Sequence, residues 1–114
     1  MHYMLTIYNN EAALTAIEGP DREEFERAHS SVNEELRRSG EFVDSHELSD
    51  RDARVVRSEH GRLIVTDGPF VRAKDWVGGY YVVDCADIDR AVEIAGRFIE
   101  GRYAPVEVRR VVVE

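Results

Sequence analysis

The chain has 114 residues, of which 43% are hydrophobic and 33% charged, and its formal net charge at pH 7 is −8. A chain of this length buries roughly two-thirds of its unfolded surface, so we predict a single domain over residues 1–114 that folds without a metal or disulfide. The acidic balance argues against nucleic acid and anionic membranes as partners, because cationic side chains drive both interactions.

The cysteine content and the N-terminus bear on where the protein works. Cys85 is the single cysteine and cannot form an intrachain disulfide, which is typical of a reducing compartment. It lies in an apolar run and is predicted to be a small core residue. The N-terminus lacks the basic and long apolar regions of a signal peptide, and no apolar run approaches the roughly 20 residues that span a bilayer. We expect a cytoplasmic protein with no membrane partner.

The first half of the chain predicts a strand and a long helix. Residues 3–8 are rich in β-formers and indicate the first strand, followed by a short helical turn over residues 12–17. Asp21 is a good N-cap residue, and Glu24 three residues later completes a pattern like a capping box. Apolar residues then recur at helical spacing until Gly40, which ends the helix. They are Phe25, Ala28, Val32 and Leu36.

The second half predicts mainly strands. A strand covers residues 42–48, and residues 53–57 and 62–66 form a β-hairpin joined by residues 58–61. Residues 79–84 form another strand, and residues 105–113 a long final one. Between them Asp87 caps a second helix, whose apolar face consists of Ile88, Ala91, Val92, Ala95 and Ile99.

The order β-α-β, hairpin, β-α-β is the pattern of a ferredoxin-like α+β sandwich. Each helix has one apolar stripe, so both are expected to cover the same sheet face. The last strand carries valines on both faces, with Val108 and Val112 on one side and Val111 and Val113 on the other. Because two helices cannot hide both faces, we expect a homodimer in which two sheets pack face to face.

One motif resembles a known family. The run Asp67-Gly68-Pro69-Phe70, followed by Lys74-Asp75-Trp76-Val77-Gly78-Gly79, resembles the DGPF signature of the YCII-related domain family, a strand, D-G-P-F and then K-E-x-x-G-G. The resemblance covers nearly the whole chain and implies a dimeric α+β barrel. Physically, Asp67 ends a strand, Gly68 is expected at positive φ, and Pro69 stops pairing. The family is mostly uncharacterised, so the resemblance implies no substrate.

His29 is the first candidate catalytic residue. It lies one helical turn from Phe25 and from Val32, so it shares their buried stripe. A titratable group there is costly unless it is hydrogen-bonded or functional. Arg27-Ala28-His29 and Glu34-Glu35-Leu36 are similar to a family pattern, R-x-x-H-x-x-x-x-x-E-L, that is linked to an Asp-His pair. The alternative is a half-buried histidine bonded to a backbone carbonyl.

Asp67 is the expected partner of His29. A carboxylate that accepts from one imidazole nitrogen fixes the tautomer and leaves the other nitrogen to act as a base. The alternative is that Asp67 only bonds the amides of its own turn. Asp44 and Asp75 stay open as other partners of His29.

Six residues are candidates for substrate binding: Asp44, His46, Phe70, Lys74, Asp75 and Tyr80. Asp44 and His46 alternate with apolar residues on one strand, a pattern that can line a cavity, and Phe70 and Tyr80 supply apolar walls. Lys74 holds an anionic substrate or is simply solvated, and Asp75 replaces the more usual Glu of the family pattern. The histidines lack metal-binding spacing and no nucleotide-binding motif occurs, so neither a metal nor a cofactor is predicted.

Two functions compete. The first is a cofactor-free acid/base enzyme, isomerase- or lyase-like, that uses a His-Asp pair on a small organic substrate. It follows from the resemblance, because related dimeric barrels include enzymes that act on lactones and on chlorinated aromatic breakdown products. The alternative is a non-catalytic dimeric module that binds a ligand or a protein. DGPF-type domains are associated with extracytoplasmic-function sigma factors in some bacteria, which implies a regulatory role for such a module.

Overall fold

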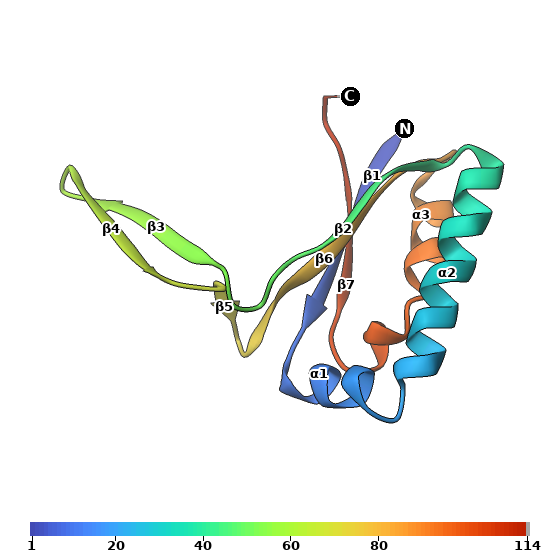
Figure 1. The fold of residues 1–114 in the computed structure, drawn as a ribbon. Helices are drawn as coiled ribbons and strands as arrows, with labels where there is room; N and C mark the ends of the chain where they lie inside the picture. The colour runs from blue at the N-terminus through green and yellow to red at the C-terminus, as the bar shows by residue number, and fades with distance from the viewer. Residues whose placement is uncertain (114) are drawn as a thin grey trace.

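A computed structural model describes residues 1–113, and Figure 1 shows one sheet with all helices on a single face and a hairpin that projects beyond it. The elements, in chain order, are β1 (His2–Asn9), α1 (Glu11–Glu18), α2 (Arg22–Ser39), β2 (Phe42–Glu47), β3 (Arg54–Glu59), β4 (Arg62–Asp67), β5 (Val71–Arg72), β6 (Asp75–Asp84), α3 (Ile88–Ala95), the 3₁₀ helix η1 (Ile99–Arg102) and β7 (Val106–Arg110).

The main sheet has the strand order β2-β6-β1-β7, with the short β5 paired to β6, and all its pairs are antiparallel. This confirms the predicted ferredoxin-like α+β fold, because the strands joined through helices are separated by one strand in the sheet. Alternation places Tyr3, Leu5 and Ile7 of β1 in the buried core. From β6, Tyr81 and Val83 join the same core under the helices.

Helix α2 ends as predicted but begins differently. Gly40 has φ 81°, and its N–H donates to the Leu36 carbonyl, which closes the last turn. The predicted capping by Asp21 is wrong, since its side chain makes no hydrogen bond to the helix amides. The carboxylate instead accepts from the Tyr103 hydroxyl, 2.5 Å away. Tertiary contact therefore replaces the local cap.

Helix α3 begins at its predicted cap, because the Asp87 carboxylate accepts from the Arg90 amide at 3.0 Å. Its predicted apolar face is partly wrong. Ile88 and Val92 are exposed, whereas Ile94 is fully buried, so the buried stripe is rotated relative to the expected one. The helix also ends at Ala95, and a separate turn, η1, follows it.

The last strand is shorter than predicted. β7 ends at Arg110, which pairs with Tyr3 of β1. Tyr3 is the second residue of β1, which begins at His2, so little of β1 is left for further pairing. A final hydrogen bond joins the Val111 amide to the His2 carbonyl. Val112 and Val113 lie beyond the sheet and are exposed.

The hairpin of β3 and β4 forms a second, two-stranded sheet, which we call the arm (residues 54–67). It leaves the main sheet between β2 and β5 and extends away from the helices (Figure 1). Its predicted four-residue connection is shorter in the structure, because pairing continues to Glu59–Arg62. Only His60 and Gly61 remain in the turn, and both have positive φ, 50° and 75°. Positive φ at both positions is what a type I′ turn requires.

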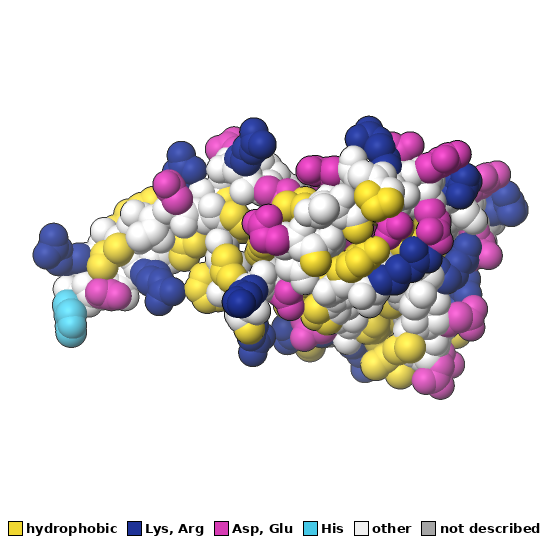
Figure 2. All heavy atoms as spheres, turned by 90° about the horizontal axis from the view of Figure 1, so that it is seen from below, with side chains coloured by type: hydrophobic (Ala, Val, Ile, Leu, Met, Phe, Trp, Pro, Cys, Tyr) yellow, Lys and Arg dark blue, Asp and Glu magenta, His cyan; other side chains and the backbone are white. Residues whose placement is uncertain are grey.

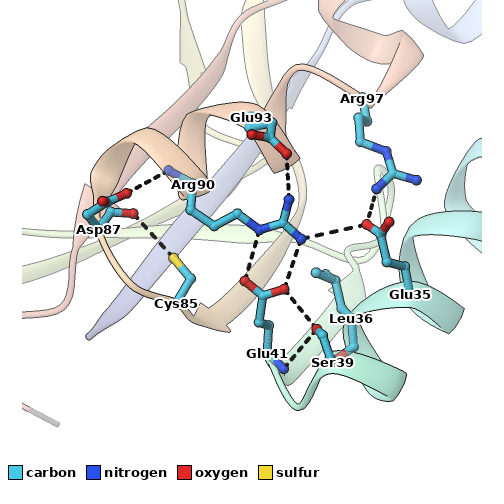
Figure 3. Close-up of polar contacts among 9 residues, drawn as sticks. All are labelled: Glu35, Leu36, Ser39, Glu41, Cys85, Asp87, Arg90, Glu93 and Arg97. Carbon is cyan, nitrogen blue, oxygen red and sulfur yellow. Dashed lines mark hydrogen bonds and ion pairs between the residues drawn. The ribbon is translucent and has the colours of Figure 1, made fainter.

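Arg90 ties α3 to the turn between α2 and β2 (Figure 3). Its guanidinium donates two hydrogen bonds of 2.9 Å to the Glu41 carboxylate and one of 2.6 Å to Glu93. Arg97 pairs with Glu35 beside it. The hydrogen bond from Arg90 holds the pKa of Glu41 below its usual range. This network ties α3 to α2 and to the turn that leads into β2.

Candidate functional site

A cavity of about 310 Å³ lies between the ends of β1, β2 and β6 and the helices α1 and α2. Four apolar side chains form much of its wall: Ile7, Leu14, Ile17 and Phe25. His29 and Glu100 also line it, although they are far apart in the chain. Such a pocket, mostly apolar with a few convergent polar groups, is the usual form of a small-molecule site.

Two glycines keep the β6 side of the cavity narrow. A Cβ on Gly79 would lie 2.9 Å from the His46 carbonyl oxygen, and one on Gly78 would lie 3.0 Å from the Asn9 Cβ. Neither position has room for a side chain without a shift of its neighbours. The absence of side chains at Gly78 and Gly79 therefore allows β6 to approach β1 and β2 closely at the edge of the cavity.

His29 projects from α2 among aromatic rings, and both of its nitrogens have partners. Nε2 is 2.7 Å from Oε2 of Glu100 on η1, and Nδ1 is 3.0 Å from the Tyr81 hydroxyl on β6. The imidazole stacks on Phe98 with ring centroids 4.9 Å apart. The centroid of the Phe25 ring lies 4.5 Å from that of the imidazole. His29 thus faces the core, as its position on the helical stripe predicts.

The hydrogen bonds around Tyr81 are compatible with one neutral tautomer of His29. Asn33 donates to the Tyr81 oxygen at 2.7 Å, and the phenolic proton can then be donated to Nδ1 of His29. Burial raises the pKa of Tyr81, which keeps this proton in place. A neutral imidazole then carries its proton on Nε2 and donates it to Glu100. In this arrangement Asn33 donates to Tyr81, Tyr81 donates to His29, and His29 donates to Glu100.

Glu100 is the exception, because one of its oxygens has no partner. The residue is only 5% exposed, and within the part of the chain that the structure describes its Oε1 accepts no hydrogen bond. An unsatisfied buried acceptor costs about 1–3 kcal/mol. Sequence reasoning missed this residue, since Glu100 stands in no motif and its neighbour Ile99 was assigned to a helix face. The His29–Glu100 pair joins residues 71 positions apart.

Within one chain the predicted pairing of His29 with Asp67 is wrong. Asp67 ends β4 in the arm, its side chain is 93% exposed, and it faces Arg54 at 3.7 Å. Asp67 lies at the base of the arm, where it pairs with Arg54, while Tyr81 and Glu100 occupy both nitrogens of His29. The other carboxylates considered are also engaged elsewhere.

Asp44 belongs to a separate cluster on β2 and β6. Its carboxylate lies 3.1 Å from Nε2 of His46 and accepts from the Tyr80 hydroxyl at 3.0 Å. This hydrogen bond raises the pKa of Tyr80. Because neighbouring residues on a strand alternate, the Tyr80 side chain points to the sheet face opposite Tyr81. His46 and Tyr80 border the cavity, whereas Asp44 is not among its lining residues.

The other predicted binding residues lie near the base of the arm, outside the cavity. Phe70 is 61% exposed and is covered in part by the guanidinium of Arg57, 5.8 Å from its ring centre. Lys74 lies in the tight turn between β5 and β6 at φ 77°. Asp75 accepts from the Asn10 side chain at 3.0 Å. None of Phe70, Lys74 and Asp75 lines the cavity.

Gly68 has a structural role that differs from the expected one. Its φ is not in the positive range. A Cβ at this position would lie 3.1 Å from the Ala53 Cβ, and the Gly68 amide donates to the Ala53 carbonyl at 3.0 Å. The glycine is needed for close contact across the base of the arm, and the motif closes the hairpin there.

Searches for other kinds of site give two results for residues 1–113. No three or more His, Cys, Asp or Glu side chains are grouped so that they could hold a metal ion. No helix among these residues has the length and apolar character needed to cross a membrane.

Comparison with known proteins identifies related chains. The profile of the YCII-related domain matches residues 1–113. The uncharacterised protein R00369 of Rhizobium meliloti (strain 1021) is 31% identical over 96 residues, which cover 83% of this chain and 77% of that protein.

Proposed function

Because this chain belongs to the YCII-related domain family and its relative in Rhizobium meliloti is described as uncharacterised, we propose a function from the chemistry of the cavity. The proposal is a cofactor-free enzyme that transfers a proton on a small organic substrate, as an isomerase or a lyase does. One observation carries it: the buried Glu100 lines the cavity, and among residues 1–113 its Oε1 has no hydrogen-bond partner.

The two members of the His29–Glu100 pair take different roles in this proposal. Both nitrogens of His29 are engaged, whereas one oxygen of Glu100 is not, which favours Glu100 as the proton acceptor. The Nε2–H of His29 holds the other carboxylate oxygen and so fixes the direction of the free one. His29 is then a positioning residue. This reverses the roles expected from a histidine base oriented by a carboxylate.

The proposed step is a simple proton transfer. A C–H or O–H bond of the substrate breaks, an O–H bond forms at Oε1 of Glu100, and the electron pair stays on the substrate. Return of the proton at another atom gives an isomer, and loss of a leaving group gives an elimination. The aromatic and aliphatic wall limits water around the carboxylate, which raises its effectiveness as a base.

Proton exchange in D₂O tests this step without knowledge of the full substrate. Small carbonyl and hydroxy compounds are incubated with the protein, and the loss of their proton signals is followed by NMR. We expect exchange with the wild-type protein that Glu100→Gln abolishes and that Asp67→Asn, an exposed change in the arm, leaves unaltered. Equal exchange by wild-type and Glu100→Gln proteins would contradict the proposed role.

A second candidate function is a non-catalytic, regulatory ligand-binding module. It is favoured by the hydrogen bonds of His29, Tyr81 and Asn33, which are already satisfied and hold the cavity in one shape. In the exchange experiment, compounds that shift the His29 signals and yet keep all their protons would support this alternative.

We also propose that the protein forms a homodimer. Figure 1 shows helices on one sheet face only, and the other face bears Met4, Tyr80 and Val82. The arm exposes Val56 and Leu63, and Figure 2 shows apolar side chains along it. A two-stranded hairpin is marginally stable alone, so a covering partner would stabilise it.

Charge supports a second copy as this partner. The arm has three arginines and two acidic residues, a net charge of +1, whereas the rest of the chain has twelve basic and 21 acidic residues, a net charge of −9. Opposite charges favour contact between the arm of one copy and the body of another. Light scattering coupled to size exclusion tests the dimer, and a monomer at micromolar concentration would rule it out.

A further inference from the structure

We infer that the ligand of the cavity is a small protonated amine on an apolar body. This inference rests on the second candidate function, the ligand-binding module, because an ammonium group paired with Oε1 of Glu100 would occupy the oxygen that serves as the base in the enzyme proposal. Three features support it: the charge of the lining residues, the unpartnered oxygen of Glu100, and the shape and polarity of the rest of the wall.

The residues that line the cavity include four carboxylates and no lysine or arginine. The carboxylates are Glu18, Glu47, Asp50 and Glu100. A carboxylate or phosphate ligand would meet these four like charges, against which the lining sets two histidines, His29 and His46, and this balance disfavours its binding. Lys74, which the sequence suggested as an anion-binding residue, is not part of the lining. The local field therefore selects against anions and in favour of a cation.

The free oxygen of Glu100 requires a donor rather than an acceptor. Among the residues that the structure describes, Oε1 has no partner, while Oε2 is held by the imidazole of His29. A ketone, an ester or an ether offers no proton to this oxygen and would leave it unsatisfied. An ammonium group offers three N–H donors and also neutralises the buried charge, and hydrogen bonds between charged groups are the stronger ones.

The remainder of the cavity fits an apolar body of limited size. Ile7, Leu14 and Ile17 supply an aliphatic surface, and the volume of about 310 Å³ is near the lower end for small-molecule sites. Phe25 also lines the cavity, with its ring centre 4.5 Å from that of His29, and so adds an aromatic face to the wall. A cation near such a face gains further attraction. A primary amine on a single apolar ring would place its ring against the aliphatic side chains and its ammonium group at the carboxylate of Glu100.

Three probes built on the same cyclohexane ring test the inference: cyclohexylamine, cyclohexanol and cyclohexanecarboxylate. Each is titrated at neutral pH while the ring signals of His29 are followed by NMR, which reports binding at the cavity itself. We expect the amine to bind about tenfold or more tightly than the alcohol, a difference of about 1.4 kcal/mol, and the carboxylate to cause no shift.

Two variants distinguish the effect of the charge in the cavity on probe affinity from the effect of the protein's net charge. Glu100→Gln should weaken the amine about tenfold and leave the alcohol unchanged. Glu34→Gln removes the same charge from the exposed face of α2 and should leave all three affinities unaltered. If Glu100→Gln does not fold, the comparison of the three probes on the wild-type protein still decides the question.

The outcomes distinguish the inference from the proposed function. Binding of the alcohol or the carboxylate as tightly as the amine, with shifts at His29, would overturn the amine class and leave the cavity as a small-molecule site. If none of the probes shifts the His29 signals, the cavity is not such a site, and the proposed function fails together with the inference.

Discussion

Replacement of Glu41 by Gln should destabilise the protein, because it removes the negative charge that forms an ion pair with Arg90. The guanidinium of Arg90 makes two hydrogen bonds of 2.9 Å to this carboxylate, and Ser39 donates a further one of 2.8 Å. The pair joins α3 to the turn that follows α2, so its loss loosens the contact between these two segments (Figure 3).

The size of the effect follows from partial burial. Hydrogen bonds to charged groups contribute about 1.5–3 kcal/mol, whereas exposed ion pairs contribute about 0.2–1 kcal/mol. The Glu41 side chain is 17% exposed and that of Arg90 26%, which places this pair between the two classes. Arg90 also keeps Glu93 as a partner after the change. We expect Glu41→Gln to cost about 1.5 kcal/mol, with a coupling energy of about 1 kcal/mol to Arg90.

The same pair predicts a dependence of stability on pH. The hydrogen bond from Arg90 lowers the pKa of Glu41 in the folded state below its unfolded value of 4.5. The stabilisation is therefore complete above that unfolded value and is lost as the pH falls through the lowered folded pKa. The difference between the wild-type protein and Glu41→Gln should accordingly shrink in acid.

Urea denaturation of the wild-type protein, Glu41→Gln, Arg90→Met and the double variant measures the coupling energy. The cycle is run at neutral pH and again at about pH 3, below the unfolded pKa. Glu34→Gln, which removes an exposed i,i+4 pair with Arg38, serves as the control and should change little. A coupling energy within error of zero at neutral pH, or one unchanged in acid, would refute this reasoning.

Three further changes probe the site and its supports. Gly79→Ala should cost roughly 1–3 kcal/mol by urea denaturation, because its Cβ would lie 2.9 Å from a carbonyl oxygen, whereas Gly101→Ala, with nothing within 4 Å, should be near neutral. Tyr81→Phe should cost about 1–3 kcal/mol, since it removes a hydrogen-bond partner from the half-buried side chains of His29 and Asn33, and a smaller loss would argue against that network. Asp67→Asn should leave the NMR signals of the His29 ring unmoved, and a shift would place Asp67 at the site after all.

The fold was predictable because its information is local and periodic. Apolar spacing along α2 placed Val32 and Leu36 on one face, and Gly40 marked the end of that helix. The order of strands and helices then left few arrangements of the sheet. Errors fell where tertiary contact overrides local preference, as at Asp21, whose carboxylate bonds Tyr103 instead of the helix amides.

The site was only half predictable. Helical spacing was enough to place His29 on the core side of α2. Its partner Glu100 lies 71 residues later on a 3₁₀ turn, whose position depends on how η1 packs rather than on any local pattern. Asp67 drew attention because of its motif, but nothing in that motif encodes the direction in which the arm leaves the sheet.

Because the arm ends in a two-residue turn at His60 and Gly61, its length can change without a change in the rest of the fold. Its strands pair without interruption from Arg54–Asp67 to Glu59–Arg62, and they form a sheet separate from the main one. Deletion of two facing pairs would shorten the ribbon by about 7 Å and keep every remaining side chain on its original face. The reach of the hairpin can thus change by such steps while the cavity and the ferredoxin-like core stay as they are.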